Sequence, residues 1–196
     1  MRRRAARQRP RGLITFHVSR ITSHASRPMT KVTNIVVAGL GGQGVLKGTD
    51  ILADAALRAG YDVKKSEIKG MSQRGGSVTG DVRFGKHVFS PMVPAGEADF
   101  LLVLEPTQVE PHCYMLRPGG VLITPDAVAA DQLPNKKTLN VALLGSLSAH
   151  LPLAEALWLD ALRASFAETF FEGNRKAFLI GRKAQKGRGS EFQSEG

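Results

Sequence analysis

Short apolar runs and mixed polar segments alternate along most of the chain, in an order typical of strands separated by helices. The runs at 34–39 and 99–104 are apolar enough for buried strands, and residues 62–68 and 121–124 fit two more. Residues 77–84 alternate with a period of two, as a half-buried strand does. Residues 45–59 instead carry a helical pattern that ends at Gly60, with small or apolar residues on one face: Val45, Gly48, Leu52, Ala55 and Ala59.

The remaining patterns complete the predicted fold. Gly85-Lys86 predicts a hairpin turn between the strand at 77–84 and a strand at 87–90, and four helices are expected at 107–116, 140–150, 153–171 and 175–182. Residues 153–171 are apolar on more than one side, which predicts burial against more than the sheet, for instance against a partner chain. We therefore predict an α/β fold: a Rossmann-like, open, mostly parallel sheet flanked by helices, with a β-hairpin insertion.

A glycine-rich segment, Gly39-Leu-Gly-Gly-Gln-Gly44, joins the first predicted strand to the first helix. Glycines allow a tight turn in which backbone N–H groups approach a ligand, and the helix N-terminus adds unpaired donors and partial positive charge. We predict cofactor-binding residues here: Gly39, Gly41, Gly42, Gln43 and Gly44. The segment is no Walker A loop, because Val45 stands where that loop has lysine. The alternative is that these glycines only allow the strand and the helix to pack closely.

The same spacing, G-x-G-x-x-G, also occurs in dinucleotide-binding domains. Those domains place an acidic residue at the end of the second strand, about 20 residues further on, and Asp62 and Glu67 lie in that neighbourhood. An NAD(P)-binding Rossmann oxidoreductase is therefore the alternative function.

Charge divides the chain into three parts. Residues 1–28 contain eight arginines and no acidic residue, whereas residues 29–181 contain 15 basic and 15 acidic residues. We interpret 1–28 as a basic disordered arm or a mis-annotated start, with a targeting sequence as a further alternative. Residues 29–183 are predicted to form a single α/β domain and residues 184–196 a disordered tail. The formal charge of +10 thus belongs to the ends, and a nucleic-acid-binding or regulatory role of the arm has little support because no aromatic platform accompanies the arginines.

The sequence offers few groups for chemistry. Cys113 is the single cysteine, so this chain supplies no cysteine set for an iron–sulfur cluster, and the five histidines are scattered. No apolar run approaches the length of a membrane span. We predict no catalytic residue, no metal site and no membrane association, and a cytoplasmic location.

Several motifs, in order, resemble a known family. Besides the glycine segment these are 66–78 (Ser-Glu-Ile-Lys-Gly-Met-Ser-Gln-Arg-Gly-Gly-Ser-Val), 90–94, 96–99, Glu105 and 174–181. Together they resemble the gamma domain of 2-oxoacid:ferredoxin oxidoreductases, and the Met-Ser-Gln-Arg-Gly-Gly-Ser-Val version is most similar to the beta subunit of the indolepyruvate type. The resemblance covers about residues 33–183.

The resemblance implies a subunit that is inactive alone. The complex would oxidatively decarboxylate a 2-oxoacid to an acyl-CoA and pass electrons to ferredoxin. Thiamine diphosphate and iron–sulfur clusters would reside on a large alpha subunit, and coenzyme A would be the co-substrate. This chain would complete the active-site cleft, with the glycine segment at the coenzyme A site. A second loop would face the substrate or the partner: Glu67, Gln73, Arg74, Gly75, Gly76 and Ser77. The alternative for Arg74 is a structural salt bridge at the interface.

Overall fold

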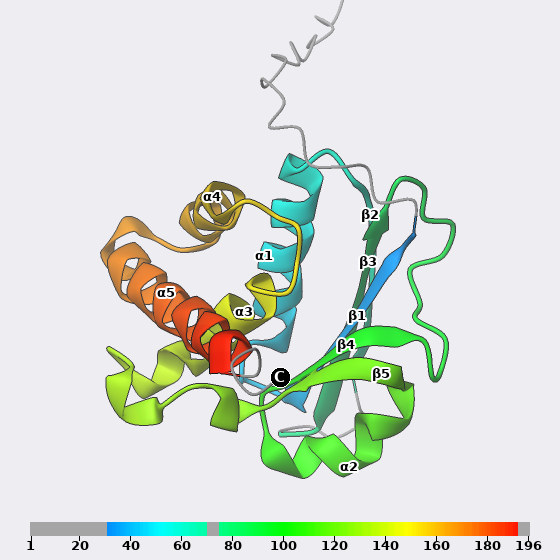
Figure 1. Cartoon of the computed structure of the whole chain (residues 1–196), viewed down its shortest axis with the longest axis horizontal. Helices are drawn as coiled ribbons and strands as arrows, with labels where there is room; N and C mark the ends of the chain where they lie inside the picture. The colour runs from blue at the N-terminus through cyan, green and yellow to red at the C-terminus, as the bar shows by residue number, and fades with distance from the viewer. Residues whose placement is uncertain (1–30, 70–74, 192–196) are drawn as a thin grey trace, which may run out of the picture.

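The computed structural model describes residues 31–69 and 75–191. Five strands and five α-helices, with short 3-10 turns between them, form one mixed sheet with helices packed on it (Figure 1). The strands are β1 Thr33–Leu40, β2 Asp62–Lys69, β3 Ser77–Gly85, β4 Ala98–Val103 and β5 Leu116–Ile123. The helices are α1 Val45–Arg58, α2 Val109–His112, α3 Leu139–Ser148, α4 Glu155–Ser165 and α5 Glu168–Glu191.

The sheet has the strand order β2-β3-β1-β4-β5, with β1 at its centre. β1 pairs in parallel with β4, and β4 with β5, while β3 runs antiparallel to both of its neighbours. Residues 33–39 of β1 are all buried, which agrees with the continuous apolar character of residues 35–39. The predicted fold class, an open and mostly parallel sheet flanked by helices, is confirmed.

Helices α1, α3, α4 and α5 cover one face of the sheet (Figure 1). α3 lies beneath α5, which explains why every residue from 141 to 148 is buried. The two helices touch through their backbones at Gly145 and Gly181. A Cβ atom on Gly181 would overlap the carbonyl oxygen of Ala142, and one on Gly145 would overlap that of Phe178. Close packing of this face therefore depends on two missing side chains.

The second face of the sheet is covered less completely. Residues 86–97 pass over it as a long loop, and α2 lies near the ends of β4 and β5 (Figure 1). A small second core forms there, in which Val93 of the loop and Val109 and Met115 near α2 pack on β1 and β4. Within the described residues, β3 meets α2 on this face only at its start, where Ser77 lies near His112.

The antiparallel partner of β3 differs from the prediction. Residues 87–90 form no strand, because side chains occupy their backbone groups. Val88 N–H donates to the Asp62 carboxylate at 2.8 Å, and the Ser90 carbonyl accepts from Arg83 at 3.1 Å. β3 pairs instead with β2 and β1. The predicted hairpin at 85–86 was therefore wrong.

Three helix predictions also change. The helix expected at 153–171 breaks at Phe166, whose backbone is extended, into α4 and the start of α5. Residues 107–116 form only the short α2 flanked by 3-10 turns, and Pro111, which lacks an N–H group, lies within it. α5 runs on to Glu191, so residues 184–191 are helical where a disordered tail was predicted. Good helix formers such as Lys183, Ala184 and Gln185 account for this extension.

Two other expectations have a plain outcome. Most apolar residues of α4 are accommodated within the chain, as Trp158 packs against Phe178 with ring centroids 5.7 Å apart. The predicted arm at 1–28 lies outside the described residues. Within the described part, no helix combines the length and the apolar character that a membrane span requires.

Candidate functional site

The candidate site lies where the connections from two neighbouring parallel strands diverge. β1 continues into α1 on the helical face, whereas β4 continues into α2 on the other face (Figure 1). Open α/β sheets bind ligands in the crevice outside the carboxyl ends of such strands. The glycine segment follows β1 at this crevice, and Glu105 follows β4.

Gln43 fixes the shape of the glycine turn. Its Oε1 accepts the Leu40 N–H at 2.8 Å, and its backbone N–H donates to the Leu40 carbonyl at 3.1 Å. Its Nε2 donates to Glu105 Oε2 at 2.9 Å, which ties the turn after β1 to the turn after β4. Gln43, predicted to bind a cofactor, thus serves here to hold the two turns together.

The glycines of the turn are required for different physical reasons. A Cβ atom on Gly39 would lie 2.9 Å from Val45 Cγ2, so Gly39 allows the close approach of strand and helix. Gly42 and Gly44 have φ values of 92° and 87°, which side chains rarely tolerate, and a Cβ atom on Gly44 would also overlap the Asn140 amide. The packing reason therefore applies to Gly39 and Gly44, whereas Gly42 is required by the backbone conformation of the turn.

The turn presents backbone donors to the crevice. Gly44 is the N-cap of α1 without a side-chain cap, and Gly42 is exposed. Among the described residues, neither the Gly42 nor the Gly44 N–H donates to a protein acceptor, whereas the Gly41 N–H donates to the Gly76 carbonyl at 2.9 Å. Two N–H groups at a helix N-terminus suit an anionic ligand. The Glu105 carboxylate beside them opposes such a ligand by its charge.

The second predicted loop is described only at its edges. Gln73 and Arg74 lie outside the described residues. Gly76 receives the bond from the glycine turn, and Gly75 has a φ of 68°. Ser77 Oγ lies 3.5 Å from His112 Nε2. The structure thus places the end of this loop directly against the glycine turn and α2.

Glu67 points elsewhere. It binds Lys65 Nζ at 2.8 Å, and Lys65 also pairs with Asp50 of α1, so both side chains face α1. Burial lowers the pKa of Lys65, but its hydrogen bonds to Asp50 and Glu67 raise it more, and the net direction is upward. Glu67 therefore faces away from the crevice, and among the described residues no hydrogen bond or ion pair joins it to the glycine turn.

The dinucleotide alternative fails on topology. Dinucleotide-binding domains place the strand with the acidic residue next to β1, but here the antiparallel β3 lies between β1 and β2. Asp62 lies at the opposite end of β2 from the crevice, where it binds the Val88 N–H. That bond holds the pKa of Asp62 below its ordinary value. Neither candidate acid can reach a ribose in the crevice.

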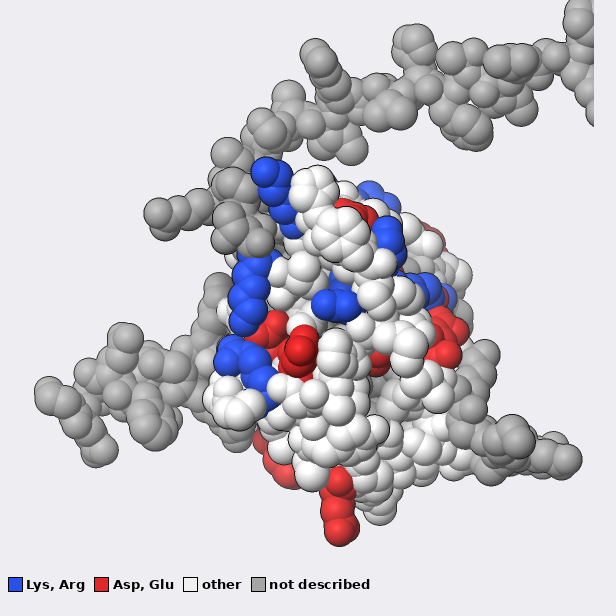
Figure 2. Space-filling model, turned by 90° about the vertical axis from the view of Figure 1, so that its right-hand side faces the viewer, with Lys and Arg blue, Asp and Glu red and all other residues white. Residues whose placement is uncertain are grey.

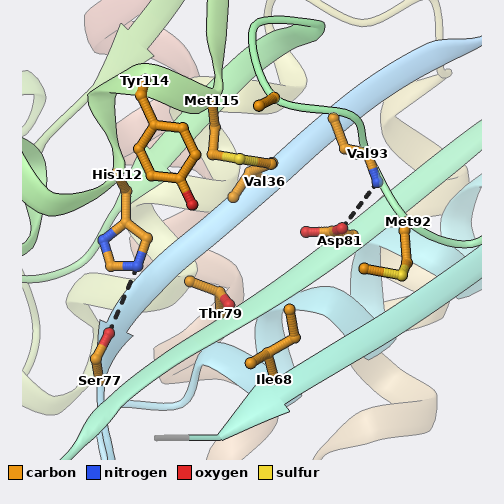
Figure 3. Close-up of a pocket in the computed structure, with 11 residues that line it drawn as sticks. Val36, Ile68, Ser77, Thr79, Asp81, Met92, Val93, His112, Tyr114 and Met115 are labelled. Carbon is orange, nitrogen blue, oxygen red and sulfur yellow. Dashed lines mark hydrogen bonds between the residues drawn. The ribbon is translucent and has the colours of Figure 1, made fainter.

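A hollow of about 350 Å³ lies on the second face of the sheet (Figure 3). Its wall combines apolar side chains of β1, β2 and the 86–97 loop with Ser77, Thr79 and His112. Asp81 lies in it, only 5% exposed, and its Oδ2 accepts the Val93 N–H at 2.8 Å. Burial raises the pKa of Asp81 above its ordinary value, against that hydrogen bond and the charge of Arg83.

Sequence reasoning missed the residues that support the turn from other elements. Glu105 was noted only as part of a motif, although its place just after a parallel strand was a usable signal. His112 and Asn140 had no such signal. His112 Nδ1 donates to the Gln108 carbonyl at 2.9 Å, which directs its Nε2 toward Ser77. The positions of His112 and Asn140 depend on how α2 and α3 pack.

Metal-binding groups are sparse in the described part of the chain. No group of three or more His, Cys, Asp or Glu side chains there could hold a metal ion. Cys113 is exposed and donates to the Glu110 carbonyl at 3.2 Å.

Comparisons with known proteins agree with the motifs. Residues 34–137 match the family model described as pyruvate ferredoxin/flavodoxin oxidoreductase. Indolepyruvate oxidoreductase subunit IorB of Thermococcus kodakarensis is 35% identical, covering 80% of this chain and 97% of the relative. The same subunit of Pyrococcus horikoshii is 34% identical, with the same coverage.

Solved structures show the same fold. The gamma subunit of a keto/oxoacid ferredoxin oxidoreductase from Geobacter sulfurreducens superposes with a TM-score of 0.68 and 24% identity, over 79% of this chain and 99% of that one. A second structure is that of a 2-oxoglutarate:ferredoxin oxidoreductase from Magnetococcus marinus, solved with 2-oxoglutarate, coenzyme A and succinyl-CoA bound. It superposes with a TM-score of 0.71 and 21% identity. It matches over 80% of this chain and 31% of that one.

These relatives support neither a free-standing NAD(P) enzyme nor a nucleic-acid-binding protein. The motifs, the fold and the 35% identity over nearly the full length of a relative point the same way. The chain belongs to the pyruvate ferredoxin/flavodoxin oxidoreductase family and is a subunit of an oxidoreductase.

Proposed function

We propose that this chain is the small subunit of an indolepyruvate-type 2-oxoacid:ferredoxin oxidoreductase, which converts an aryl-2-oxoacid to its acyl-CoA. The observation that carries this proposal is the 35% identity with an indolepyruvate oxidoreductase subunit over 97% of that relative. With one cysteine in the whole sequence, the chain cannot supply the four thiolates of a cluster. The proposal therefore assigns the clusters to a large partner subunit, and with them, as the resemblance implies, thiamine diphosphate.

Coenzyme A is the ligand that we assign to the glycine turn. The Gly42 and Gly44 N–H groups, without protein acceptors in the described residues, suit a phosphate oxygen. Coenzyme A would supply the thiol that accepts the acyl group. Gln43 and Glu105 hold the turn, and the bond from Gly41 to Gly76 anchors the loop that carries Gln73 and Arg74 in the sequence. We propose that Arg74 binds a phosphate or a carboxylate there, because its fork donates two parallel hydrogen bonds.

Reconstitution tests the function. The full chain and its large subunit, purified separately and then mixed, should reduce ferredoxin when given coenzyme A and indolepyruvate, whereas each subunit alone should not. We expect kcat/KM for indolepyruvate at least tenfold above that for pyruvate or 2-oxoglutarate. Equal values for all three acids would overturn the indolepyruvate assignment, and full activity of the large subunit alone would overturn the subunit role.

A single substitution tests the coenzyme A site. Glu105→Gln retains an oxygen for Gln43 Nε2 but removes the negative charge beside the turn. If a phosphate binds to Gly42 and Gly44, the KM for coenzyme A should fall roughly threefold. The reason is that the substitution removes the repulsion between the Glu105 carboxylate and the phosphate, which solvent and salt partly screen. The KM for the 2-oxoacid serves as the internal control and should not change. An unchanged KM for coenzyme A would place the phosphate elsewhere.

A further inference from the structure

The second face of the sheet has less cover than the helical face. Parallel strands are normally buried on both faces, whereas antiparallel strands often leave one face to solvent, and the hollow lies over β1, which pairs in both ways. Here the helices lie on one face, and the hollow remains open on the other between β3, β1 and the 86–97 loop (Figures 1 and 3). In the view of this side in Figure 2, charged side chains of both signs lie over the upper and middle part, and the lower middle is largely uncharged.

The 86–97 loop displays an aromatic side chain on this side. Phe89 is 97% exposed, although the residues around it are firmly held. Arg83 Nη1 donates to the carbonyls of Ser90 and Met92 at 3.1 and 2.9 Å. The carboxylates of Asp62 and Asp81 accept the N–H groups of residues 88 and 93. A backbone held in place before binding loses little entropy on binding, which favours an anchor residue of an interface at Phe89.

Apolar exposure continues from the loop into the hollow. Seven large hydrophobic side chains are exposed in the described part of the chain, and four of them belong to this loop or line the hollow: Ile68, Phe89, Met92 and Tyr114. An apolar patch of this kind marks a site of protein interaction.

Asp81 adds a charge to the hollow. Its Oδ2 binds the Val93 N–H, while its Oδ1 receives no hydrogen bond from the described residues. In Figure 3 the carboxylate lies between the β1 side of the hollow and the loop. This 5% exposed carboxylate has one hydrogen-bond donor and the nearby charge of Arg83, and its second oxygen leaves the hollow complementary to a further cationic or N–H-bearing group.

We propose that the large subunit docks on this face, with Phe89 seated in an apolar pocket of that subunit and an arginine or lysine side chain inserted toward Asp81. The inference rests on the proposed function, which supplies the large subunit. The inserted side chain should be cationic because the Asp81 carboxylate that it faces is an anion. The Magnetococcus chain, of which the matched part is 31%, carries this fold within a longer chain.

Binding of full-length variants to the purified large subunit tests the surface. Phe89→Asp should weaken the Kd at least 100-fold, with an unchanged circular dichroism spectrum and Tm, because the ring contacts little in the free chain. Phe170→Asp is the matched control, since Phe170 is 65% exposed on α5, and its Kd should change less than threefold. Asp81→Asn should weaken the Kd about tenfold and flatten its dependence on salt.

The outcomes separate the two proposals. Equal binding of Phe89→Asp and wild type would overturn the docking surface while the function stands. Loss of self-association alone, measured by sedimentation, would show that a second copy covers this face and would also overturn it. If the wild-type complex assembles through Phe89 but oxidises no 2-oxoacid, the proposed function fails and the docking surface stands. If the wild-type chains do not bind at all, both proposals fail.

Discussion

The two faces of the sheet differ in how completely they are covered. On the helical face, α3 and α5 touch through backbone atoms at Gly145 and Gly181, and the large side chains of Trp158 and Phe178 are fully buried. On the second face, a loop held by three charged side chains leaves a hollow and an exposed phenyl ring. Stability therefore depends chiefly on the first face, and the second face remains available for binding.

The largest expected effect is on the helical face. Gly181→Ala should destabilise the chain by about 3 kcal/mol, because the new methyl group overlaps the Ala142 carbonyl and forces α3 and α5 apart. Gly173→Ala on the same helix is the control. No atom lies within 4 Å of its Cβ position, and alanine favours the helix by roughly 0.5–1 kcal/mol. Urea denaturation measures both, and equal effects would disprove the close helix contact.

The glycine turn should show a smaller effect. Gly44→Ala must adopt a φ near 87° and also displace Asn140, so we expect a loss of about 2 kcal/mol. Gly60→Ala isolates the backbone cost, because Gly60 has a φ of 86° and no atom within 4 Å of its Cβ position. The difference between the two variants measures the Asn140 contact. A difference of zero would mean that Asn140 moves aside freely.

The two carboxylates that hold the 86–97 loop should respond to pH in opposite directions. Burial raises the pKa of Asp81, so wild type should lose stability relative to Asp81→Asn as the pH rises above 3.8. The Val88 N–H lowers the pKa of Asp62, so the stability that Asp62 contributes is present above 3.8 and lost as the pH falls below it. Thermal melts of both asparagine variants across acidic pH measure this. Parallel profiles would contradict the assignment.

The smallest expected effect belongs to the second face. Phe89→Ala should change the free energy of unfolding of the free chain by less than about 0.5 kcal/mol, because the ring is almost fully exposed. Trp158→Ala, on the helical face, should cost about 3–5 kcal/mol. Chemical denaturation of the two variants compares the faces directly, and a large loss for Phe89→Ala would mean that this loop contributes to the core.

Periodicity predicted those elements whose pattern follows from local burial. β1, α1 and β4 were found within one or two residues because each buries a continuous run or a single face. The partner of β3 was missed, because alternation at 77–84 does not specify which strand pairs with it. The break at Phe166 was missed since apolar residues continue across it. The extension of α5 was missed since residues 183–191 are mostly polar or glycine and carry no apolar periodicity.

The candidate site was likewise predicted only where a local pattern marks it. The glycine turn was located from its spacing, but its support by Gln43 and Glu105 joins residues 62 positions apart and leaves no local pattern. Glu67 was assigned to the substrate or partner loop because it is close in sequence, yet strand alternation turns it toward α1 and Lys65. The roles of Gln73 and Arg74 stay predictions.

The place of β3 in the sheet also sets the order of events during synthesis. β1 is the central strand, but its first partner along the chain is β3, with Leu40 opposite Ser77 and Thr33 opposite Phe84. β2 emerges earlier and has no strand to pair with until β3 follows. At roughly 5–20 residues per second, the apolar first strand waits several seconds for its neighbour. Because of this strand order, residues 33–40 should be shielded early while the chain is still on the ribosome.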